Sequence, residues 1–215
     1  MGTKCALLAL SPGIPREDIA RHQEGGADAA QAQVQRLFPD AWRYAETGTL
    51  DDALLPDEGV LWVGTWGPTT LIAFLDVDSA FQQASRRDGR GAWLVAVHSV
   101  VDFCGYVTPS HYKGRKVEVT FDSGPEGLTA ALAGPLLPFE EPYAEGEHAM
   151  DGFPYHPLEL GESALLWILG TCGESAPVDE VSAEIEPIDP WDMPMHRFEA
   201  GAPARKSWLA RLLGR

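Results

Sequence analysis

The chain has 215 residues, which is enough for one large domain with a hydrophobic core of its own. It carries 32 acidic and 16 basic residues, so the formal net charge is −16. Because phosphate groups attract clustered lysine and arginine, this charge argues against nucleic-acid binding by the chain as a whole. A hydrophobic content of 45% argues against wholesale disorder.

The cysteines indicate the compartment. Cys5, Cys104 and Cys172 are odd in number and widely spaced, and no CxxC pair occurs among them. A secreted disulfide scaffold would use more cysteines. The first apolar run, residues 5–10, is shorter than the apolar stretch of a secretory signal. We therefore expect a soluble protein in the reducing cytoplasm.

The first half of the chain predicts several strands and a helix. The apolar run 3–10 predicts a strand buried on both faces, which places it in the centre of a sheet. A helix is expected over 28–38, ended by Pro39. Further strands are expected over 42–50, 59–66 and 69–77, and the last two are joined by a tight turn at Gly67-Pro68. A short helix is expected between Asp78 and Gly89.

The second half predicts an antiparallel pair and another helix. One long strand over 92–108, a turn and a return strand over 115–124 are expected. A proline-rich region precedes a helix that begins at Pro157 and ends at Gly170 or Gly173. The predicted fold class is α+β, with a mixed, mainly antiparallel sheet of about six to eight strands and about three helices, mainly on one face. The alternative is a layered α/β fold.

The composition changes after residue 173, so we expect a globular domain over 1–173. Residues 174–199 hold eight acids and four prolines, which predicts a linker or wrapping segment over 174–202. Its apolar anchors are Trp191, Met193, Met195 and Phe198. Residues 203–215 predict a basic amphipathic helix with four bases and no acid, so the rest of the chain carries −20.

The segment around His98 is the first candidate catalytic site. On one long strand, His98, Asp102 and Cys104 would project from the same face. A histidine and an aspartate can act as a base and its orienting partner, and a neighbouring cysteine can act as a nucleophile. His98 and Asp102 would lie ~13 Å apart, so they need a third group or a bulge between them. The alternative is a sheet histidine and a turn aspartate that satisfy backbone groups.

The window 139–162 is the candidate metal site, because it holds seven acids, two histidines and no lysine or arginine. These side chains are ligand types for zinc, manganese or iron. Their spacing matches no helical motif such as HExxH, and a solvated acidic loop is the alternative. No particular cofactor is indicated. The candidate ligands are Glu140, Glu141, Glu147, His148 and His156.

The C-terminal segment carries the leading functional hypothesis, because a cationic amphipathic helix on an acidic body is typical of a docking peptide. We expect an accessory or interaction protein that attaches to a partner protein through this segment. The alternatives are docking on its own acidic domain, attachment to an anionic membrane surface, and a metal-dependent or small-molecule hydrolase using His98, Asp102 and the segment 140–156. The expected binding residues are Arg205, Lys206, Trp208, Leu209, Arg211, Leu212 and Leu213.

The order of five segments resembles an uncharacterised family of actinobacterial proteins, grouped as a domain of unknown function. The segments are MGTKCALLALSPG, RLFPDAW, HSVVDFCGY, LPFEEPYAEGEH and PYHPLELGESALLWILG. The resemblance covers residues 1–170 and implies that 98–102 and 138–162 are the most recognisable segments. It implies no activity or catalytic residue, and the chain from 174 onward lies outside it.

Overall fold

The computed structural model describes residues 4–38, 42–75, 84, 87–98, 103–109, 112, 135–144, 155–171 and 184–201. The helices of this part are α1 (Pro15–Arg21), α2 (Gly26–Leu37), α3 (Leu50–Ala53), η3 (Pro138–Glu140), α6 (Glu141–Ala144), α7 (Pro157–Leu169) and η4 (Pro190–Asp192). The strands are β1 (Lys4–Ser11), β2 (Trp42–Thr49), β3 (Val60–Trp66), β4 (Thr69–Phe74), β5 (Gly91–His98), β6 (Phe103–Val107) and β7 (Pro194–Ala200).

The strands form one seven-stranded sheet in the order β2-β7-β3-β4-β1-β5-β6. Every pairing of neighbours in it is antiparallel. With helices packed on this sheet, the fold is α+β, as the sequence predicted. The apolar strand β1 lies between β4 and β5, which confirms its expected central place. The tight turn at Gly67-Pro68 is also confirmed, because it joins the paired strands β3 and β4.

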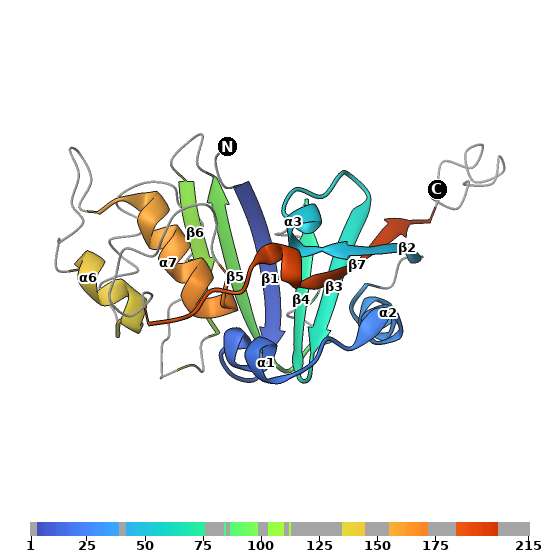
Figure 1. Cartoon of the computed structure of the whole chain (residues 1–215), viewed down its shortest axis with the longest axis horizontal. Coiled ribbons are helices and arrows are strands. Elements are labelled where there is room, and N and C mark those ends of the chain that lie inside the picture. The colour runs from blue at the N-terminus through green and yellow to red at the C-terminus, as the bar shows by residue number, and fades with distance from the viewer. Residues whose placement is uncertain are drawn as a thin grey trace, which may run out of the picture.

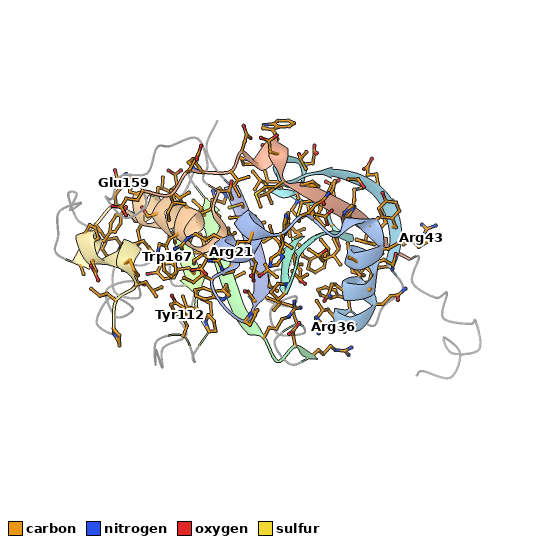
Figure 2. All side chains as sticks on the ribbon, turned by 60° about the horizontal axis from the view of Figure 1, so that its bottom comes forward. Arg21, Arg36, Arg43, Tyr112, Glu159 and Trp167 are labelled. Carbon is orange, nitrogen blue, oxygen red and sulfur yellow. The ribbon has the colours of Figure 1, made fainter. Side chains whose placement is uncertain are left out.

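Helices cover both faces of the sheet, whereas the sequence predicted helices mainly on one face. Alternate side chains of β1 enter two separate hydrophobic clusters, with Leu7 in one and Leu8 in the other. The Leu7 cluster contains side chains of α1, α3 and α7, and the Leu8 cluster contains side chains of α2. In Figure 1, α7 crosses in front of β5 and β6. Figure 2 shows Tyr112 close to Trp167 of α7, and their ring centroids lie 6.1 Å apart.

The predicted start of α7 is confirmed, and of the two expected ends, Gly170 and Gly173, the structure shows Gly170. Pro157 is its first residue, where a missing N–H costs nothing. Gly170 follows the last residue with a φ of 76°, a left-handed conformation that favours glycine. Within α7, Gly161 allows a close approach to the sheet, since a Cβ there would lie 2.9 Å from the Cys104 Sγ.

The expectation of one long strand over 92–108 is wrong. β5 ends at His98, and β6 begins at Phe103 and returns antiparallel beside it. Directly paired residues of neighbouring strands share a face of the sheet, and Val97 pairs with Cys104 while His98 pairs with Phe103. His98 and Cys104 therefore lie on opposite faces, because they belong to two separate antiparallel strands and not to one continuous strand.

The expected linker or wrapping segment 174–202 includes the strand β7. β7 lies between β2 and β3 and pairs with both. Of the four expected anchors, Met193, Met195 and Phe198 are buried, whereas Trp191 is 63% exposed. The folded sheet thus continues well past residue 173, to Ala200.

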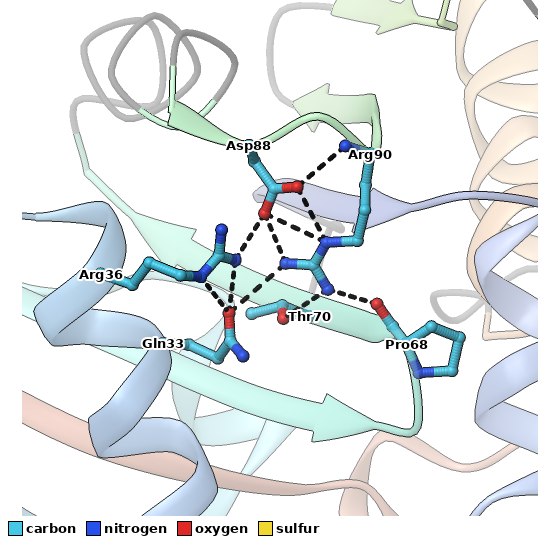
Figure 3. Close-up of polar contacts among 6 residues, drawn as sticks. All are labelled: Gln33, Arg36, Pro68, Thr70, Asp88 and Arg90. Carbon is cyan, nitrogen blue, oxygen red and sulfur yellow. Dashed lines mark hydrogen bonds and ion pairs between the residues drawn. The ribbon is translucent and has the colours of Figure 1, made fainter.

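A polar cluster ties the residues before β5 to α2 and to the β3–β4 turn. The Asp88 carboxylate accepts hydrogen bonds from Arg36 of α2 and from Arg90 (Figure 3). Arg90 also donates to the carbonyl of Pro68. The Asp88 side chain is buried, whereas both guanidinium groups reach solvent. The buried negative charge of Asp88 is therefore paired with two positive charges.

Several predictions lie outside the described residues. They are most of the short helix expected from Asp78 to Gly89, of which the structure describes Ala84 and residues 87–89, the return strand 115–124 and the basic helix 203–215. Within the described ranges, no helix combines the length and the apolar character needed to cross a bilayer.

Candidate functional site

An apolar pocket lies at the end of the sheet where β1 and β6 begin and β4 and β5 end. Its volume is about 180 Å³. Residues that follow α3 close one side of it. It is lined by Cys5, Ala6, Leu54, Leu55, Pro56, Phe74, Leu75, Ala96, Val97, His98 and Phe103.

The hollow is explained by two small side chains at its centre. Ala6 of β1 and Ala96 of β5 are direct partners across the two strands. Two residues further along each strand, Leu8 and Leu94 are partners and fill the same face with larger side chains. The sheet is therefore well packed in its middle and open at this end.

The rim of the pocket exposes apolar surface. Leu55 is 58% exposed and Leu75 is 59% exposed, and both line the pocket. They are two of the few large apolar side chains that the described residues leave in solvent. An exposed apolar rim around a concave apolar site is typical of a place where a ligand binds.

His98 is the polar side chain of the pocket, and the sequence had singled it out. The ring lies at the end of β5 and is partly exposed. Its buried Nδ1 atom has no hydrogen-bond partner within the described part of the chain. Because Nδ1 is buried, the imidazole can contact a molecule in the pocket only through the other atoms of its ring.

The arrangement does not support Cys104 as a nucleophile. Cys104 is fully buried, and burial raises the pKa of its thiol well above the ordinary value. Burial also raises the pKa of Cys5, in the pocket wall, to about 12. Both thiols are protonated at neutral pH and are poor nucleophiles. The third predicted catalytic residue, Asp102, lies outside the described residues.

The expected metal ligands are not brought together as far as the structure describes them. Glu140 is buried and accepts hydrogen bonds from the Tyr106 hydroxyl and the Leu137 amide, both at 2.6 Å. These bonds give it a structural role at the start of α6. No group of three or more metal-binding side chains occurs among the described residues.

The other expected ligands divide between described and undescribed parts. Glu141 is exposed on α6, and His156 precedes α7 with a buried Nδ1 that has no partner within the described ranges. Glu147 and His148 lie outside those ranges. A metal site that combines them with His156 stays a prediction, and metal analysis of the purified protein tests it.

A series of hydrogen bonds lies on the α2 side of the sheet, and the sequence analysis did not predict it. The Thr47 hydroxyl of β2 lies 3.0 Å from the Nδ1 atom of His196 on β7. The Nε2 atom of His196 lies 3.2 Å from the Oε1 atom of Glu24, which precedes α2. The Tyr44 hydroxyl lies 2.9 Å from the Thr47 hydroxyl. A hydroxyl, an imidazole and a carboxylate are thus aligned in one chain.

The comparisons with known proteins assign the chain to a family. The model of a family described as a family of unknown function, DUF6928, matches residues 5–198. The chain belongs to this family. No curated protein and no solved structure matched. The DUF6928 match extends beyond the resemblance expected over 1–170 and includes most of β7.

The DUF6928 region contains both sites. It begins at Cys5 in the pocket wall and ends at Phe198, so it includes every residue that lines the pocket. It also includes Glu24, Thr47 and His196. The basic segment 203–215 lies outside it. Both sites thus belong to the part of the chain that defines the family.

Proposed function

We propose that this protein binds a small apolar ligand that carries one polar group, in the pocket at the end of the sheet. The observation that supports this proposal most is the combination of an apolar wall with the single imidazole of His98. Such pockets obtain affinity from apolar burial and orientation from a few polar groups.

The size of the pocket defines the ligand class. An apolar cavity of about 150 Å³ accommodates benzene. The pocket here, at about 180 Å³, matches a single aromatic ring or a branched alkyl group with one hydroxyl or carbonyl. A larger ligand would extend over the rim at Leu55 and Leu75.

The probes p-cresol and toluene test this proposal, because they differ in one hydroxyl. NMR titration of the full chain should give saturable shifts at Ala96 and His98 with both probes, and tighter binding of p-cresol. His98→Phe should remove the preference for p-cresol. Ala96→Leu should weaken binding of both probes at least about ten-fold, since it fills the hollow. Ala92→Leu is the matched control, because it lies on the same strand away from the pocket.

A second variant guards against misfolding. Leu55 is 58% exposed, so Leu55→Ser should keep the melting temperature and still weaken both probes. If neither probe shifts Ala96 or His98 up to its solubility limit, the proposal is wrong. It is equally wrong if Ala92→Leu weakens the probes as much as Ala96→Leu does.

The charge distribution favours a second candidate function, attachment to a partner protein through residues 203–215. This segment holds four bases, whereas the rest of the chain carries −20. The full chain should capture at least one protein from the native cell that residues 1–202 do not capture. After purification, that protein should bind the full chain and not residues 1–202. Equal binding to both chains contradicts this function. Flotation with anionic liposomes at low and high salt tests the membrane alternative.

We also propose that the protein acts in the cytoplasm of an actinobacterium. The small number of widely spaced cysteines supports the compartment. The resemblance of its segments to actinobacterial proteins supports the origin. Fractionation of the native cell with an antibody against the chain tests the compartment.

A further inference from the structure

We propose that Thr47 is a nucleophile that accepts acyl groups from small activated esters, with His196 as its general base and Glu24 as the residue that positions His196. This site is separate from the apolar pocket, because β2 lies at the opposite margin of the sheet from β5 and β6. The proposal therefore does not depend on the ligand-binding function.

The hydrogen bonds have one consistent direction. A carboxylate only accepts, so the Nε2 atom of His196 carries the proton that is donated to Glu24. The Nδ1 atom then holds a lone pair and accepts from the Thr47 hydroxyl. The Tyr44 hydroxyl is left to donate to the Thr47 oxygen. This is the arrangement of nucleophile, base and orienting carboxylate that activates a hydroxyl.

The base is fixed behind an accessible hydroxyl. The side chains of His196 and Glu24 are 5% and 10% exposed, whereas Thr47 is exposed on the edge strand. The Glu24 carboxylate is held in turn by the amide of Gly26, at 2.8 Å, and by that of Thr65. An ester can therefore approach Thr47 from solvent while the imidazole keeps its orientation.

An irregularity in the strand brings the two hydroxyls together. Thr47 pairs directly with His196, so their side chains share a face. Tyr44 would point to the other face in a regular strand, because it is three residues away. The register shifts between Tyr44 and Glu46, and this bulge returns Tyr44 to the face of Thr47. Bulges often redirect side chains next to active sites.

The proposed step conserves atoms and charge. The Thr47 oxygen attacks the ester carbonyl carbon, and its proton moves to the Nδ1 atom of His196. The bond from that carbon to the leaving oxygen breaks, and the imidazolium returns the proton to the leaving alkoxide or phenoxide. The product is an ester on Thr47, which water can hydrolyse through the same base.

The experiment uses the full chain and p-nitrophenyl acetate. Peptide mapping by mass spectrometry should find an acetyl group on Thr47. Thr47→Val should abolish this adduct and Thr47→Ser should retain it, and both changes are small and lie on the surface. His196→Gln should slow acetylation of Thr47 about 100-fold or more, the typical contribution of a general base. His22→Gln is the control, because His22 is an exposed histidine of another ion pair.

Glu24 needs a measurement that reports orientation and not only stability. In Glu24→Ala, the ring-nitrogen NMR shifts of His196 should lose the pattern of a proton fixed on Nε2. The proposal is overturned if acetyl groups of the wild type map only to lysines or the N-terminus. It is also overturned if Thr47→Val releases p-nitrophenol as fast as the wild type, or if His22→Gln slows the reaction as much as His196→Gln.

Discussion

Asp88 and Arg36 are 52 residues apart in the chain, yet the Asp88 carboxylate accepts a hydrogen bond of 2.5 Å from the Arg36 guanidinium (Figure 3). The same carboxylate oxygen accepts a hydrogen bond of 2.5 Å from Arg90. One buried carboxylate therefore holds α2 and the start of β5 together.

Replacing this carboxylate should destabilise the fold. Asp88→Asn keeps the shape but removes the negative charge that two guanidinium groups share, and hydrogen bonds to charged groups contribute about 1.5–3 kcal/mol. We expect a loss of about 2 kcal/mol in the free energy of unfolding, measured by urea denaturation. Asp57→Asn, at an exposed aspartate, is the control and should change little. Equal stability of Asp88→Asn and the wild type would contradict this role.

The same residue predicts a dependence on pH. Burial would raise the pKa of Asp88, but hydrogen bonds from Arg90 and Arg36 lower it below the ordinary value of about 3.9. A lowered pKa in the folded state means that the stabilisation is fully present above the unfolded value and is lost as the pH falls toward the folded value. The difference in unfolding free energy between the wild type and Asp88→Asn should be constant from pH 7 to about pH 5 and shrink below about pH 4.

The two described cysteines should be inert in the folded protein. Burial raises the pKa of Cys5 to about 12, and burial raises the pKa of Cys104 as well. Iodoacetamide reacts with thiolates, so at pH 8 it should leave both thiols unmodified in the native chain and modify both in urea. Peptide mass spectrometry measures the two sites separately. Rapid modification of native Cys104 would restore it as a candidate nucleophile.

Truncation should separate the strand β7 from the residues that follow it. A chain that ends at Gly201 keeps every described strand and should melt like the full chain. A chain that ends at Met193 lacks β7, so β2 and β3 lose their shared partner. We expect this shorter chain to lose its cooperative thermal transition in circular dichroism. A cooperative transition in both chains would show that β7 is dispensable.

Much of the fold could be predicted where local signals are strong. Continuous apolar residues predicted the central place of β1, Pro157 marked the start of α7, and Gly170 was one of two expected ends of that helix. Prediction failed where composition conceals structure. The apolar pair Val100 and Val101 hid the end of β5 at His98, and the acids and prolines of 174–199 hid β7. β7 tolerates the nearby acids and prolines because it pairs with β2 and β3 and because its buried Met195 and Phe198 pack in the core.

The two sites were predictable to different degrees. His98 was found from the sequence because a histidine in an apolar strand is conspicuous, although its pocket depends on Ala6 and Ala96, which carry no signal. The hydrogen-bonded set of Glu24, Thr47 and His196 was missed because His196 lies 172 residues after Glu24 and 149 residues after Thr47. No rule of sequence spacing predicts that Thr47 and His196 are neighbours, because only the pairing of β2 with β7 brings them together. The Pro/acid-rich setting of His196 also concealed it.

The place of β7 between β2 and β3 has a consequence for biosynthesis. β2 and β3 leave the ribosome before β7, because the strand that separates them begins only at Pro194, whereas β3 ends at Trp66. Until Ala200 has emerged, neither strand has its native neighbour on that side. The nascent chain must therefore keep an open gap in its sheet, and we expect it to need protection from pairing with other chains during that time.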